Sequence, residues 1–143
     1  MKKLILLITV LAFWGCDNST GSGNITELEG IWNGTDNYSD SIMRIYNFSG
    51  SDFNYTEDGH ANDEDGEWYV GTFSINTQTN PKQIDAVIID CFPNGSEYLG
   101  ETALGIYKIE GNTLTLASHE PGVPTRPSSF SGGGTRVWVL IKQ

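Results

Sequence analysis

Few residues of this chain have the types and spacing that nucleophilic or metal chemistry requires. Its two cysteines, Cys16 and Cys91, lie too far apart for a C-x-x-C metal motif and are too few for a disulfide framework. Cys91 follows Asp90 in an apolar run, where an acidic neighbour does not favour a thiolate nucleophile. The two histidines, His60 and His119, lie beside acidic residues and belong to no catalytic motif. We therefore expect a non-enzymatic protein without a cofactor, in which Cys91 is a small buried apolar residue.

An acidic run at residues 58–67, DGHANDEDGE, has the oxygen-rich side chains and glycines that suit calcium. The run does not follow the EF-hand pattern, because aligning Gly66 with the invariant glycine puts Ala61 at the first ligand position and Thr72 at the last. We expect a solvated loop between two strands and no metal site. A weak calcium-dependent surface module is the alternative interpretation.

The charge balance excludes one large class of function. The chain has 143 residues, with 8 Lys and Arg against 18 Asp and Glu, and a formal net charge of −10. Nucleic-acid binding depends on Lys and Arg that neutralise phosphates, so no nucleic-acid partner is expected. The length suits one domain, and 38% hydrophobic residues are too many for a disordered acidic tail.

The N-terminus has the features of an export segment. Lys2 and Lys3 precede uncharged, mostly apolar residues 4–14, which are too few to span a bilayer. Gly15 directly before Cys16 resembles the lipobox of bacterial lipoproteins, which implies that Cys16 is lipidated and becomes the new N-terminus. An ordinary signal peptide with a chance cysteine is the alternative. We expect a signal peptide at 1–15, a flexible tether at 16–27 and a folded domain at 28–143, anchored to a membrane of the cell envelope.

The folded domain shows a pattern of successive short strands. Each candidate is rich in β-branched or aromatic residues, and turn sequences such as Glu110-Gly111-Asn112 separate them. No segment of ten or more residues has a helical apolar period, so an antiparallel, up-and-down β-barrel of about eight strands is predicted. The segment from Ile84 is apolar on both faces, so part of its outer face should be covered. The expected strands lie at 30–32, 42–48, 53–56, 68–75, 84–89, 104–109, 113–116 and 137–141.

Several motifs resemble a lipocalin-like bacterial domain of uncharacterised function, found in planctomycete-type proteins. They are P-K-x-I-D at 81–85, G-I-Y-x-x-x-G-[DN]-x-L at 105–114 and R-P-x-x-F at 126–130, with a weaker G-x-W at 30–32. The resemblance covers 28–143 and implies a lipocalin-like barrel, with no activity attached. The chain departs from it at Ala117 and Ser118, where many members have a cysteine.

The motif residues have a structural interpretation and a functional alternative. We expect Asp85 and Arg126 to pair across strands and pin one end of the barrel, with a polar site as the alternative. Trp32 is expected to close the barrel floor against a residue of the last strand such as Arg136. The motif residues singled out are Trp32, Pro81, Lys82, Asp85, Arg126 and Phe130.

Two functions of different classes remain for the barrel. The first is a membrane-anchored protein that binds a small apolar or amphipathic ligand inside the barrel. The second is a structural or protein-interaction lipoprotein whose barrel is filled by its own side chains, with an unknown protein partner. For the first function, the expected lining residues are Tyr46, Phe48, Trp68, Phe73 and Tyr107.

Overall fold

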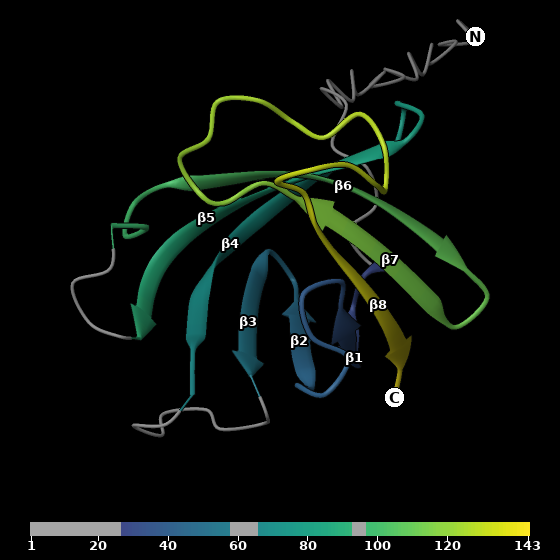
Figure 1. Ribbon diagram of the computed structural model, residues 1–143, viewed down its shortest axis with the longest axis horizontal. Helices are drawn as coiled ribbons and strands as arrows, with labels where there is room; N and C mark the ends of the chain where they lie inside the picture. Colours follow the sequence, from purple (N-terminus) through teal and green to yellow (C-terminus); the bar gives the residue numbers. More distant parts are fainter. Residues whose placement is uncertain (1–26, 58–65, 93–96) are drawn as a thin grey trace, which may run out of the picture.

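The structure is a computed structural model that describes residues 27–57, 66–92 and 97–143. These residues form a closed antiparallel barrel in which each strand pairs with the next and β8 returns to β1 (Figure 1). The predicted all-β, up-and-down barrel is therefore confirmed. Cys16 and residues 58–65 lie outside the described residues. The strands are β1 (Gly30–Asp36), β2 (Arg44–Ser49), β3 (Asp52–Glu57), β4 (Trp68–Asn76), β5 (Lys82–Phe92), β6 (Thr102–Glu110), β7 (Thr113–Ser118) and β8 (Arg136–Lys142).

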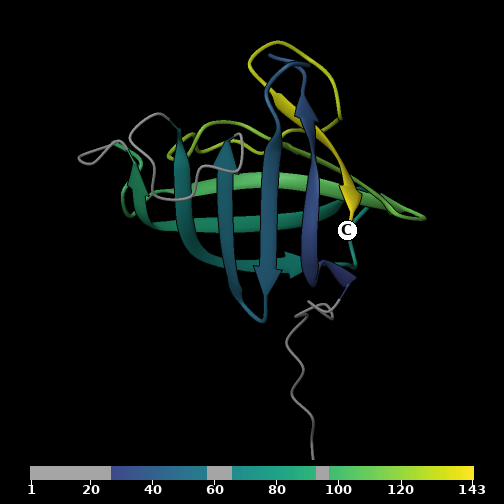
Figure 2. The same ribbon diagram turned by 90° about the horizontal axis from the view of Figure 1, so that it is seen from below.

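All eight predicted strands are present, because side chains that branch at Cβ or carry a ring fit the pleated surface of a half-buried sheet. Pairing between β8 and β1 closes the sheet, so the barrel formed by the described residues has no edge strand. In Figure 2 the purple and blue strands β1–β3 run at a steep angle to the green strands β6 and β7. The described residues include no helix with the length and apolarity to cross a bilayer.

The two ends of the barrel differ, and we name them by their connections. At the closed end, tight turns join β2 to β3 and β6 to β7, and Gly50 and Gly111 supply positive φ angles of 59° and 62°. At the open end, longer segments join β1 to β2 and β7 to β8. Leu28 and Trp32, exposed by 0% and 1%, seal the closed end, where the Trp32 Nε1 donates to the Leu28 carbonyl at 2.7 Å.

The expectation that Trp32 packs against Arg136 of the last strand is wrong. Antiparallel pairing places Lys142 opposite Trp32, and the Lys142 ammonium lies 5.1 Å from the centre of a Trp32 ring. Arg136 lies at the other end of β8, where the register brings it to the open end of the barrel. Arg136 and Lys142 are six residues apart along β8, at a rise of about 3.3 Å per residue.

Glu27 adds a polar contact at the closed end. It was expected as the last residue of the tether, yet its carboxylate accepts hydrogen bonds from the Tyr107 hydroxyl and, at 2.7 Å, from Lys82 Nζ. Glu27 therefore belongs to the folded barrel, and the chain enters the described domain at the end opposite the open one.

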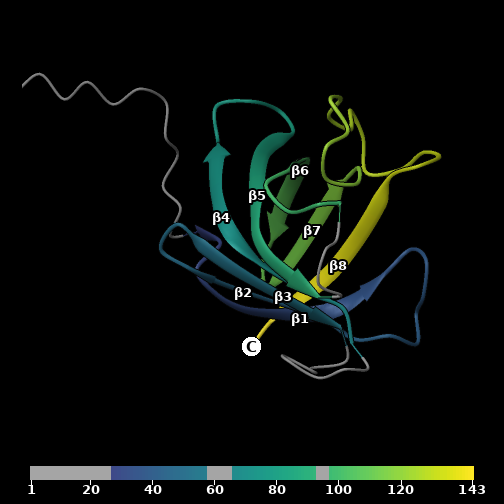
Figure 3. The same ribbon diagram turned by 90° about the vertical axis from the view of Figure 1, so that its left-hand side faces the viewer.

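Part of the segment 119–135, between β7 and β8, folds against the outside of the barrel (Figures 1 and 3). Its Arg126 forms the expected ion pair with Asp85 and also donates to the carbonyls of Ile84 and Gly105 on neighbouring strands. Lys108 of β6 lies over the Phe130 ring, 5.7 Å from its centre. The expected cover over the outer apolar face of β5 is not present at Val87 and Ile89, which are exposed by 37% and 58%. On this face the segment contacts Asp85, through Arg126.

Candidate functional site

A cavity of about 200 Å³ lies within the barrel and opens toward the end where β1 and β7 finish. Seven of the eight strands contribute inward-facing residues to it, β1 being the exception. The floor is apolar, with Phe48, Phe53 and Ile84 from the closed half of the barrel. The mouth is polar, with Glu67 and Glu120 among its residues. An apolar floor beneath a charged mouth suits an amphipathic molecule.

A series of aromatic rings lines one wall of the cavity. Ring centres are 5.9 Å apart for Trp138 and Tyr46, 4.8 Å for Tyr46 and Tyr55, 5.6 Å for Tyr55 and Tyr69, and 6.2 Å for Tyr69 and Tyr98. These spacings fall within the range in which aromatic pairs stabilise each other, so the wall is a continuous aromatic surface. We refer to these five residues as the aromatic wall.

One polar atom of the aromatic wall is left without a partner. Trp138 is 6% exposed, and its Nε1 has no hydrogen-bond acceptor among the described residues. Leaving a buried N–H unsatisfied costs about 1–3 kcal/mol, and such groups are rare in folded proteins.

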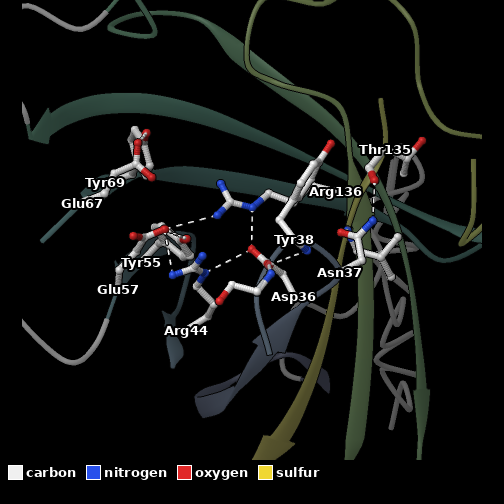
Figure 4. Close-up of polar contacts among 12 residues, drawn as sticks. Asp36, Asn37, Tyr38, Arg44, Tyr55, Glu57, Glu67, Tyr69, Thr135 and Arg136 are labelled. Atoms are coloured by element: carbon white, nitrogen blue, oxygen red, sulfur yellow. Dashed lines mark hydrogen bonds and ion pairs between the residues drawn. The ribbon is translucent and has the colours of Figure 1, made fainter. Parts of the chain in front are cut away.

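A cluster of four charges, with Asp36 and Arg44 buried and Glu57 and Arg136 half-buried, lies beside the cavity at its open end (Figure 4). Asp36 Oδ2 accepts from Arg44 Nε at 3.1 Å and from Arg136 Nε at 2.6 Å. Glu57 Oε1 lies 2.9 Å from Arg44 and 3.2 Å from Arg136, and it also accepts from the Tyr55 hydroxyl. Each guanidinium thus faces both carboxylates, and the cluster is neutral as a whole.

The Asp36 carboxylate illustrates how this cluster is stabilised. Burial of Asp36 by itself raises its pKa, but hydrogen bonds from Arg136, the Ser39 amide and Arg44 outweigh that effect, and the pKa is lowered below the ordinary value. Asp36 Oδ1 also accepts the amides of Tyr38 and Ser39 at 2.9 Å, so both of its oxygens are occupied. The carboxylate is therefore held ionised and is fully used within the protein.

The tyrosines of the barrel are held neutral. Burial raises the pKa of Tyr46, Tyr55, Tyr69, Tyr98 and Tyr107 above the ordinary value of 10.0. For Tyr69 a hydrogen bond to Glu67 adds to the effect, because the neutral phenol can donate and the phenolate cannot. The cavity wall therefore presents phenol groups at physiological pH.

The expected lining residues divide into three groups. Tyr46 and Phe48 line the cavity. Phe73 packs beneath it, 4.9 Å from Phe48 between ring centres, and Tyr107 lies at the closed end against Glu27. Trp68 was placed on the wrong face: it stacks on Phe92 at 6.5 Å, and neither residue lines the cavity.

The sequence held a signal that distinguishes Trp68 from its neighbour. Successive side chains of a strand point to opposite faces, so Phe73 inside the barrel requires Tyr69 inside and Trp68 outside. Tyr55 follows in the same way from Phe53 two residues earlier. Sequence reasoning also missed Tyr98, Trp138 and the four-charge cluster, because strand alternation does not give the registers that bring charged residues of neighbouring strands together.

The remaining predicted residues have structural places. Cys91 is a free thiol exposed by 2%, which confirms the expectation of a buried apolar residue. Pro81 lies in the turn before β5, and Lys82 binds Glu27 at the closed end, far from the cavity mouth. His119 lies at the mouth, with Nδ1 2.9 Å from the Thr125 carbonyl and Nε2 3.3 Å from the Thr135 hydroxyl.

Within residues 27–57, 66–92 and 97–143, no three His, Cys, Asp or Glu side chains are placed to bind a metal ion. The acidic run proposed as a calcium alternative falls largely within residues 58–65, outside the described part. No family model, curated protein or solved structure matches the chain. The resemblance to the lipocalin-like domain stays an expectation based on its motifs.

Proposed function

We propose that this protein binds a small amphipathic molecule inside its barrel and catalyses no reaction. The observation that carries the proposal is the cavity of about 200 Å³, with an apolar floor, the aromatic wall and a polar mouth. An eight-stranded barrel is just wide enough to be filled by its own side chains or to hold one small ligand. The volume left open among the inward side chains of this barrel favours the second outcome.

We also propose that the protein is a lipoprotein of the cell envelope, anchored through Cys16. Support comes from the export segment and the Gly15-Cys16 sequence. Glu27, where the described chain begins, lies at the closed end of the barrel, so the tether joins the domain at the end opposite the cavity mouth. This arrangement leaves the mouth unobstructed by the point of attachment.

Native mass spectrometry of the protein, purified from its own kind of host without detergent, tests the binding proposal. The matched variants are Ala86→Leu, which places a larger side chain in the cavity, and Val87→Leu, which changes the adjacent outward-facing residue. A stoichiometric small molecule should accompany the wild type and Val87→Leu and be absent from Ala86→Leu. A bare mass for all three, with no thermal shift on adding apolar and amphipathic compounds, would instead favour a filled barrel with an interaction role.

A further inference from the structure

The charge at the cavity mouth distinguishes between classes of amphipathic ligand. Arg136 faces the cavity, but its charge is matched by Asp36 and Glu57 within the four-charge cluster. Glu67 and Glu120 also line the mouth and lie outside that cluster. The mouth and the cluster beside it therefore carry four carboxylates against two guanidiniums, so the local potential favours a cation.

The aromatic wall provides a second and independent preference for a cation. Ring faces attract a cation within about 6 Å of their centres, and the effect strengthens when the pair is shielded from water. The protein's own Arg136 already uses this effect at the mouth, because its guanidinium lies 5.8 Å from the Tyr38 ring centre and 5.5 Å from that of Trp138. The phenol rings of Tyr55 and Tyr69 continue the same wall toward Glu67.

The volume of the cavity limits the size of the ligand. An apolar cavity of about 150 Å³ admits one benzene molecule, so about 200 Å³ accommodates one ring with a short chain. The ring would occupy the apolar floor at Phe48 and Phe53, and the chain would reach the mouth. The charged group would then lie close to Glu67.

We infer that the ligand is a small organic cation: an amine or ammonium group on an apolar body about the size of one ring. This inference rests on the proposed binding function and assigns the chemical class of its ligand. Tyr55, Tyr69 and Glu67 contact the cationic group, while Phe48 and Phe53 contact the apolar body. The net charge of −10 acts in the same direction by attracting cations toward the protein.

The assigned ligand class can be tested by isothermal titration calorimetry. The full-length protein is titrated with three probes of matched shape. The probes are 2-phenylethylamine, 2-phenylethanol and 3-phenylpropanoate, which are cationic, neutral and anionic at neutral pH. The amine should bind at least roughly tenfold more tightly than the alcohol, as expected for a shielded cation–π contact reinforced by a carboxylate. The carboxylate should bind most weakly.

Two variants test whether the preference for a cationic ligand arises at the cavity mouth. Glu67→Gln should weaken binding of the amine about fivefold or more and leave binding of the alcohol nearly unchanged, because only the cation senses the lost charge. Glu110→Gln removes the same charge from an exposed position at the closed end and should change neither affinity. Equal loss for amine and alcohol in Glu67→Gln would overturn the assigned role of Glu67.

The outcomes separate this inference from the proposed function. If the alcohol or the carboxylate binds as tightly as the amine, the cavity still binds ligands and only the cation preference is wrong. If none of the three probes binds, and native mass spectrometry shows a bare protein, the binding function itself fails.

Discussion

Arg136 Nε donates to Asp36 Oδ2 at 2.6 Å, which joins the last strand of the barrel to the first across 100 residues of sequence. The contact lies at the open end, beside the backbone pairing of β1 with β8 that closes the barrel. Because Arg44 of β2 shares the same carboxylate oxygen, three successive strands meet at Asp36. The side chain of Asp36 is 0% exposed, so this meeting point is shielded from water.

Replacing Asp36 with Asn should destabilise the protein by roughly 3 kcal/mol at neutral pH, because the buried guanidinium of Arg44 and the half-buried one of Arg136 lose a shared counter-charge. The Asp36 pKa is lowered in the folded state from an ordinary value of 3.8. Its stabilisation is therefore present above about pH 4 and lost as pH falls through the lower folded value. Denaturant unfolding from pH 7 to pH 3 should show a smaller pH dependence for Asp36→Asn than for the wild type. Asp40→Asn, in the exposed connection after β1, should behave like the wild type.

Arg126 should contribute more to stability than its ion pair alone. Its guanidinium bridges the carbonyls of Ile84 and Gly105 on β5 and β6, and both would lose a donor in Arg126→Ala. The expected loss is about 1–3 kcal/mol in urea unfolding. Asp85→Asn removes only the carboxylate charge, on a side chain 42% exposed, and should cost less than about 1 kcal/mol. Equal losses for the two variants would contradict the bridging role.

Gly71 is required by the close approach of β4 and β5. A Cβ at Gly71 would lie 1.9 Å from the Val87 carbonyl oxygen and 2.7 Å from Phe53, at the register shift between Val70 and Gly71. Backbone atoms on a paired strand cannot move aside freely, so Gly71→Ala should cost at least about 2 kcal/mol or prevent folding. Gly133→Ala, where a Cβ meets no atom within 4 Å, is the matched control and should fold normally. Thermal unfolding followed by circular dichroism compares them.

The buried tyrosines should make the protein sensitive to alkali. Five of the six tyrosines have a pKa raised above 10.0 by burial, so these phenols stay neutral in the folded state when their unfolded counterparts would ionise. Their contribution to stability is complete below pH 10 and is lost as pH rises toward the folded values. Titration of tyrosinate absorbance should show a late, cooperative step in the native protein and ordinary ionisation in denaturant. Ordinary ionisation of all six in the native protein would show that the wall is open to water.

Lipidation of Cys16 should decide where the protein is found. The full chain expressed in a bacterium should fractionate with membranes and incorporate a labelled fatty acid, because two or more acyl chains bind a bilayer strongly. Cys16→Ser should lose the label, whereas Cys91→Ser should keep it, since Cys91 is buried within the barrel. Label retained by Cys16→Ser would place the modification elsewhere.

By itself the sequence determined the strands, their order and the antiparallel topology. Short β-branched and aromatic segments separated by turns leave little room for crossover connections, so neighbours in sequence become neighbours in space. Gly111 in its tight turn and Cys91 in its apolar run were predictable on the same local grounds. The pairing of Asp85 with Arg126 was expected from the motifs and is confirmed.

Only the tertiary structure decided which side chains face one another across the barrel. Strand alternation in the sequence was enough to predict that Trp68 faces outward and Tyr69 inward. Which residue of β8 lies opposite Trp32, Lys142 and not Arg136, depends on the register of β8 with β1. The four-charge cluster brings together Asp36, Arg44, Glu57 and Arg136 from four strands. The register of β2 with β3 places Arg44 opposite Glu57, and barrel closure adds Arg136. The cavity is likewise a property of closure, because its volume is what remains after inward side chains from seven strands have packed together.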